Sequence, residues 1–122
     1  MIRAWLVAAA LGGFLSVAAG AAAAHLPAGE RAAELLRTSA LYGMVHAAAL
    51  IAVTAMAQSR SQLGLALTAA GWSFGAGMLL FSLSLFALAL SGREWLGMIT
   101  PFGGAGLLIG WAALAFHAFS RR

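Results

Sequence analysis

The sequence contains no cysteine and no lysine, and only 8% of its 122 residues are charged. The absence of cysteine excludes disulfides, thiolate metal ligands and thiol catalysis. A soluble domain of this size carries charge on roughly a quarter of its residues, whereas 63% of this chain is hydrophobic. The composition therefore excludes a water-soluble globular domain and indicates an integral membrane protein.

The basic residues are too dispersed for nucleic-acid binding. All seven are arginines, and despite the formal charge of +4 they form no basic face that could neutralise successive phosphates. Strand-like alternation of polar and apolar residues is also absent, which disfavours a transmembrane barrel. We therefore expect an all-α protein that is surrounded by the lipid bilayer and does not bind nucleic acid.

Four apolar runs predict four transmembrane helices. The expected spans are approximately residues 4–24, 39–57, 63–90 and 100–119. Each is near or above the length of about 20 residues that a helix needs to cross a bilayer. The polar segments between them are short, and the one at 25–38 is expected to join the first two spans. The chain is thus expected to form a single membrane domain, 1–122, with a four-helix transmembrane bundle.

Two local signals refine this topology. Thr100 before Pro101 is typical of a helix start, with threonine as the N-cap and proline at the first helical position. The preceding segment 95–99 is then a short interfacial approach. Trp5 and Trp95 are expected near opposite membrane interfaces, where amphipathic rings are favoured.

Arginine counts on the two sides of the membrane favour cytoplasmic termini. With four spans, one side carries Arg3, Arg60, Arg121 and Arg122, and the other carries Arg31, Arg37 and Arg93. Cytoplasmic loops carry the excess of Lys and Arg, and acids contribute little to this rule. We therefore predict that both termini lie in the cytoplasm.

Small residues at four-residue spacing predict close helix packing. They are Gly12, Ser16 and Gly20 in the first helix, Gly43 and Ala47 in the second, Gly71 and Gly75 in the third, and Gly106 and Gly110 in the fourth. In lipid, helices associate largely through such residues, because burial from water no longer drives them together. The pattern predicts a compact bundle, and assembly into a homo-oligomer or a larger complex stays open.

Polar side chains in the spans gather toward the outer side of the membrane. The candidate polar or ligand-binding cluster is His25, Tyr42, His46, Ser82, Ser84 and Thr100. Tyr42 and His46 are four residues apart and share a helix face. No Asp, Glu, Lys or Arg lies inside a predicted span, which disfavours proton-coupled transport.

Each member of this cluster has a structural and a functional interpretation. The serines can bond to the carbonyl one turn earlier, Tyr42 can anchor at the interface, and His46 can bond to Tyr42, Thr100 or His25. Alternatively, His25 and His46 could ligate a haem, or bind a metal with Glu34 as the nearest acid. A hydrolase built on a serine and His46 lacks an orienting acid. The sequence therefore identifies no catalytic residue, metal or cofactor.

The order of several short motifs resembles a known family. These motifs are Gly20-Ala21, Ala24-His25, Tyr42 with His46-Ala47, Ala70-Gly71-Trp72, Phe81-Ser82 with Ser84-Leu85, Ile99-Thr100-Pro101, Gly103-Gly104 and Gly110-Trp111. Over nearly its whole length the chain is similar to the small four-helix inner-membrane proteins typified by YwdK and YgdD, a family of unknown function with eukaryotic relatives. The resemblance implies a multi-pass protein of the bacterial inner membrane, and it supplies no activity, substrate or cofactor.

The chain departs from the family pattern at four positions. Leu83 stands where the family motif has glycine, and Phe86 stands where it has tyrosine. Val45 replaces an aromatic residue before the histidine, and Arg37 lies near a position where an acid is common. These departures disfavour a reaction that depends on a tyrosine.

Three functional hypotheses follow. The first is a non-enzymatic accessory or assembly subunit of a membrane complex, which agrees with the small size and the absence of intramembrane charge. The second is a site around His46 that binds or passes a metal ion, haem, quinone or small polar solute. The third is a membrane-embedded enzyme.

Overall fold

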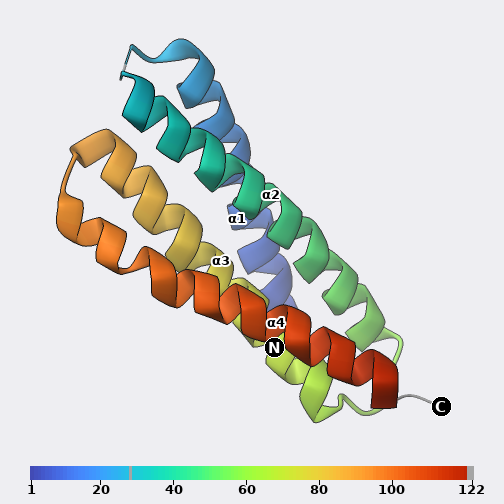
Figure 1. Cartoon of the computed structure of the whole chain (residues 1–122). Coiled ribbons are helices and arrows are strands. Elements are labelled where there is room, and N and C mark those ends of the chain that lie inside the picture. The colour runs from blue at the N-terminus through green and yellow to red at the C-terminus, as the bar shows by residue number, and fades with distance from the viewer. Residues whose placement is uncertain (28, 121–122) are drawn as a thin grey trace.

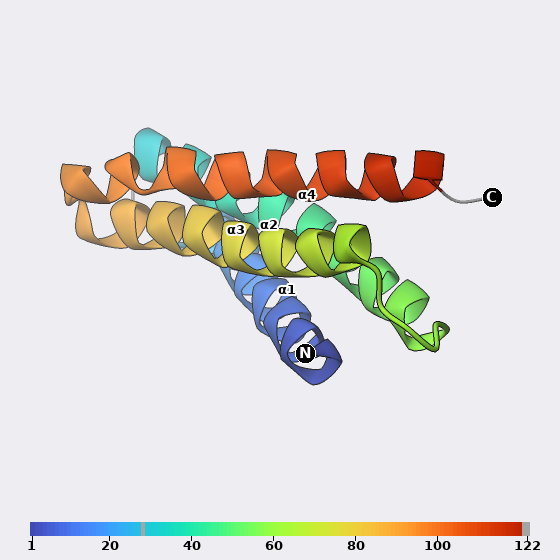
Figure 2. The ribbon, with the colours of Figure 1, turned by 90° about the horizontal axis from the view of Figure 1, so that it is seen from below.

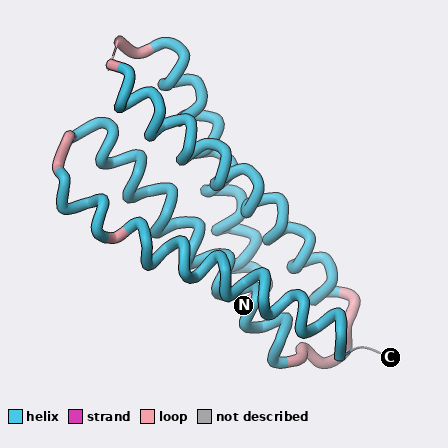
Figure 3. Tube along the Cα trace, viewed as in Figure 1, coloured by secondary structure: helices cyan, strands magenta, loops and turns pink. Residues whose placement is uncertain are grey.

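The computed structural model describes residues 1–27 and 29–120, and in this part of the chain it is all-helical (Figures 1 and 3). The elements are α1 (Ile2–His25), α2 (Glu30–Gln58), α3 (Leu65–Ser91), the short 3-10 helix η1 (Glu94–Met98) and α4 (Thr100–Ser120). By length and composition, α1, α2, α3 and the segment Glu94–Ser120 could each cross a membrane. The predicted four-helix, all-α membrane architecture is confirmed. Arg121 and Arg122, which enter the predicted orientation, lie outside the described residues.

The helices are packed in an order that follows the chain. α2 packs against both α1 and α3, and α1 makes a smaller contact with α3. α4 lies along α3, on the side away from α1 (Figure 2). The main core, around Trp5, Leu50, Phe74 and Met78, lies between these helices.

The second helix begins earlier than the predicted span. α2 starts at Glu30, so that most of the polar segment 25–38 is helical. Gly29 precedes it with a φ of 90°, a conformation that favours glycine, and the Glu30 carboxylate suits the positive end of the helix dipole. The extra turns reach η1, where Arg31 donates to both carboxylate oxygens of Glu94 at 2.7 and 3.2 Å.

Glycine brings α3 and α4 together backbone to backbone. A Cβ atom added at Gly103 would lie 2.8 Å from Phe81 Cα and 2.9 Å from the Gly77 carbonyl oxygen. A Cβ added at Gly106 would lie 3.1 Å from Gly77 Cα. Neither backbone can move without separating the helices. Gly77 and Gly103 were not among the predicted packing residues.

The predicted packing glycines have different surroundings. A Cβ at Gly12 would meet the Met78 side chain, one at Gly71 the Trp5 ring, and one at Gly110 the Phe74 ring. At Gly20 and Gly75 a Cβ would make only ordinary contacts of 3.7–3.8 Å. Ser16 is buried, donates to the Gly12 carbonyl oxygen at 2.6 Å, and lies against Gly43.

Trp5 points into the bundle. Its side chain is 1% exposed and packs beside Gly71, with the Trp72 ring edge-on at 6.1 Å between ring centroids. The space that Gly71 leaves explains this inward position, which differs from that of an anchor exposed at the interface. Trp95, in η1, is exposed.

We predict that Gly103→Ala weakens the bundle, whereas Gly104→Ala does not. The new methyl group at 103 would meet rigid backbone, while at 104 its nearest neighbour is the Phe81 ring at 3.7 Å. Forced overpacking typically costs about 1–3 kcal/mol. Unfolding by sodium dodecyl sulfate in mixed micelles, followed by circular dichroism, measures the difference. Equal unfolding midpoints for the two variants would contradict the proposed backbone contact.

Candidate functional site

Ser39 and Ser82 join α2 to α3. Ser39 Oγ donates to the Ser82 carbonyl oxygen at 3.0 Å, and Ser82 Oγ donates to the Ser39 carbonyl oxygen at 3.4 Å. Both side chains are buried. The reciprocal bonds satisfy two hydroxyl donors that lipid could not satisfy. Ser82 therefore bonds across to a neighbouring helix instead of back along its own.

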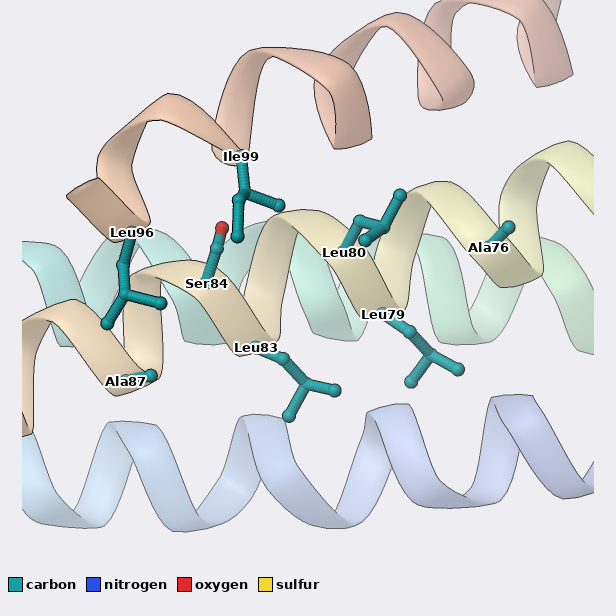
Figure 4. Close-up of a pocket in the computed structure, with 8 residues that line it drawn as sticks. All are labelled: Ala76, Leu79, Leu80, Leu83, Ser84, Ala87, Leu96 and Ile99. Carbon is teal, nitrogen blue, oxygen red and sulfur yellow. The ribbon is translucent and has the colours of Figure 1, made fainter.

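Ser84 and Thr100 join α3 to the start of α4. Their hydroxyl oxygens are 2.6 Å apart, and Ser84 Oγ also lies 3.0 Å from the Phe81 carbonyl oxygen, one turn earlier. The Thr100 hydroxyl thus bonds to another helix rather than capping α4. Ser84 lines an otherwise apolar cavity of about 460 Å³ together with Ile99 and several leucines, and its oxygen points toward Ile99 (Figure 4).

His46 connects α2 to α4 through Trp111. Trp111 Nε1 donates to His46 Nε2 at 2.9 Å, while His46 Nδ1 lies 2.7 Å from the Tyr42 carbonyl oxygen. Indole can only donate, so Nε2 must be the unprotonated nitrogen, and Nδ1 carries the proton that is donated to Tyr42. These partners assign the neutral Nδ1–H tautomer. Both ring nitrogens of this buried imidazole are therefore occupied within the protein.

Aromatic rings surround this bridge. The Tyr42 ring is nearly parallel to that of His46, at 7° and 6.2 Å between centroids, and lies 4.8 Å from Phe81. Trp111 also meets Phe74 edge-on at 4.9 Å. A groove of about 520 Å³ opens between α2 and α4. It is lined by Tyr42, His46, Phe81, Pro101, Gly104, Ala105, Leu107, Leu108 and Trp111.

The six predicted residues therefore do not line a single cavity. Tyr42 and His46 share the groove, Ser84 lines the neighbouring cavity and bonds to Thr100, and Ser82 bonds to Ser39. His25 is exposed at the end of α1 and makes no hydrogen bond to the other five. The polar groups act mainly as pairs that connect neighbouring helices.

This geometry bears on the predicted haem and metal ligands. A metal bound by His46 would have to displace either the Trp111 donor or the bond to Tyr42. Within residues 1–27 and 29–120, no three His, Asp or Glu side chains come together in a group that could hold a metal ion. The arrangement supports hydrogen bonding between helices more directly than it supports coordination.

Two of the bonding partners, Ser39 and Trp111, were not predicted. Ser39 lies at the edge of an apolar run, where a serine is common and does not indicate a contact between helices. Trp111 carried a usable signal, because a tryptophan well inside a span needs an acceptor for its indole N–H. Its pairing with His46 depends on how α2 and α4 are rotated about their axes, and a single sequence does not contain that information.

The four apolar helices and their internal hydrogen bonds define a multi-pass integral membrane protein. A family model described as "Protein of unknown function (DUF423)" matches residues 19–104, and the chain belongs to this family.

Relatives match over almost the full length. The chain is 39% identical to a UPF0382 membrane protein of Haemophilus influenzae, over 97% of this chain and 95% of that protein. It is 33% identical to the UPF0382 membrane protein YwdK of Bacillus subtilis, over 96% and 97% of the two chains. It is 34% identical to the UPF0382 inner membrane protein YgdD of Escherichia coli K12, over 95% and 89%. No solved structure matches the chain.

We predict that His46 and Trp111 are energetically coupled. Trp111→Phe removes the donor to Nε2, and His46→Leu removes the acceptor. Double-mutant cycles give hydrogen bonds between membrane helices about 0.6 kcal/mol on average and about 1.7 kcal/mol at most, and we expect a coupling energy of this size from unfolding in mixed micelles. Trp72→Phe is the matched control, since Trp72 contacts Trp5 and has no hydrogen bond to His46. If the coupling energy between His46 and Trp111 is no larger than that between His46 and Trp72, the His46–Trp111 hydrogen bond does not stabilise the bundle.

Proposed function

We propose that the protein is a non-enzymatic accessory or assembly subunit of a larger membrane complex. One observation carries this proposal: most of the polar side chains of the candidate cluster that lie in the spans are engaged in hydrogen bonds within the protein. His46 uses both ring nitrogens, and Ser82, Ser84 and Thr100 each bond to a neighbouring helix. The groups that remain for interaction are mainly apolar and lie on the outer surface.

The outer face of α4 is the surface we assign to the partner. It exposes several large apolar side chains, among them Phe102, Leu108 and Phe119. Aromatic residues are enriched where proteins bind one another. Because α4 packs chiefly along α3, this face stays open along the length of the helix. A partner membrane helix could pack there without disturbing the core.

The alternative functions have less support from the geometry. A ligand site around His46 would have to use the groove, because the imidazole nitrogens are occupied. An enzyme would need a nucleophile or a general base with a free reactive atom. Ser82 and Ser84 are bound to Ser39 and Thr100 and make no hydrogen bond to His46.

We predict that a photo-crosslinking amino acid at Leu108 on α4 captures a second membrane protein, while the same group at Phe14 on α1 does not. The two positions are similarly accessible, at 73% and 75% exposed. A difference in crosslinking yield would therefore reflect the position of a partner and not the exposure of the side chain. Mass spectrometry of the adduct identifies what is captured. An adduct of two copies of this chain would replace the accessory role with a homo-oligomer. Lipid adducts alone at both positions would contradict both forms of assembly.

We also propose that the protein lies in the bacterial inner membrane with both termini in the cytoplasm. The support is the arginine excess on that side, together with relatives named as membrane and inner membrane proteins. The α2–α3 connection, which contains Arg60 and Ser61, would then be cytoplasmic.

Single cysteines test this orientation, since the chain has none of its own. We expect an impermeant maleimide to label His25→Cys in intact spheroplasts. Ser61→Cys should react only after the membrane is permeabilised. The reverse pattern would place the termini outside, and labelling of both variants in intact spheroplasts would indicate mixed topology.

A further inference from the structure

Arg60 has an unusual partner at the end of the bundle that carries the α2–α3 connection. Its Nη2 atom lies 3.4 Å from His117 Nε2 on α4, and no carboxylate of the described residues pairs with it. All three acids of the chain are elsewhere: Glu30 and Glu34 are in the first turns of α2, and Glu94 is in η1. A half-buried guanidinium that none of these three carboxylates reaches is suited to bind the phosphate or carboxylate oxygens of a ligand.

Arg60 and His117 belong to a formed cavity. It has a volume of about 460 Å³, and Ser120 lines it together with the first residues of α3, Leu65 and Ala66. α3 has no side-chain cap, so the backbone N–H groups of its first turn are available. These groups and the helix dipole add to the attraction that Arg60 exerts on an anion.

The cavity also has an apolar side. Leu65 and Phe116 line it and are 86% and 66% exposed. A free inorganic anion gains nothing from such side chains, whereas the acyl chains of a lipid would cover them. A guanidinium binds phosphate oxygens in pairs through its planar fork of N–H donors. The cavity therefore combines a phosphate-binding part with an acyl-binding part at the end of the bundle.

We propose that this cavity binds the phosphate group of a membrane phospholipid, with Arg60 as its main ligand and the acyl chains against Leu65 and Phe116. His117 and the Ser120 hydroxyl form the wall on α4. The bound lipid would join the α2–α3 connection to the end of α4, two segments far apart in the sequence that lie at the same end of the molecule (Figure 1). This proposal is independent of the accessory-subunit role.

Native mass spectrometry of the full chain, released from mild detergent, tests the proposal. The probes are dioleoylphosphatidylglycerol, dioleoylphosphatidylcholine and inorganic phosphate, each titrated separately. We expect one phosphatidylglycerol to be retained, with binding weakened about tenfold or more in Arg60→Gln, since the substitution removes charge-assisted hydrogen bonds to the phosphate. Arg93→Gln is the matched control, because Arg93 is an exposed arginine beyond the opposite end of α3.

Each outcome decides the proposal. Retention of phosphatidylcholine with the same dependence on Arg60 also supports it, because that lipid carries the same phosphate. Binding of inorganic phosphate without either lipid would overturn the lipid assignment. If Arg60→Gln and Arg93→Gln weaken lipid binding equally, the lipid is attracted by the general surface charge and the proposed site is overturned. Should Arg60→Gln fail to fold, Arg60→Met takes its place: it keeps the apolar stem but neither the charge nor the N–H donors, and unchanged binding would overturn the role of Arg60.

Discussion

A buried polar group in the bilayer core has no water to bond with, and the rest of this structure depends on that constraint. Each hydroxyl, imidazole or indole N–H in a span must find a partner inside the protein or lose several kcal/mol. The chain meets most of this requirement between helices as well as within them, and the buried indole N–H of Trp5, which has no hydrogen-bond partner, is an exception. Ser39 with Ser82 connects α2 to α3, Ser84 with Thr100 connects α3 to α4, and His46 with Trp111 connects α2 to α4.

These hydrogen bonds are possible only because small residues let the backbones approach. Gly77 and Gly103 bring α3 and α4 into direct backbone contact, and Gly43 leaves the space that Ser16 occupies between α1 and α2. In lipid, such contacts replace the hydrophobic burial that holds a soluble bundle together. Packing and hydrogen bonding therefore support each other: the glycines set the separation of the helices, and the polar pairs set their rotation.

The sequence predicts the helices well and their mutual orientation poorly. Long apolar runs and the lack of intramembrane charge are sufficient to predict four helices, since lipid tolerates little else. The early start of α2 was not predicted, because charged residues such as Arg31 are typical of a loop between spans. In the structure, Arg31 is helical and pairs with Glu94 of η1. The pairing of His46 with Trp111 could not be derived, because it depends on the rotation of two helices separated by 65 positions along the chain.

The rotation of α4 links the three surfaces on which functional arguments rest. Its glycine side, with Gly103 and Gly106, must face α3, and Trp111 must reach His46. With both conditions met, Leu108 and Phe116 face outward, and His117 points toward Arg60. The groove, the exposed face of α4 and the cavity at Arg60 are thus consequences of one orientation. A change that rotates α4 would therefore disturb all three surfaces together.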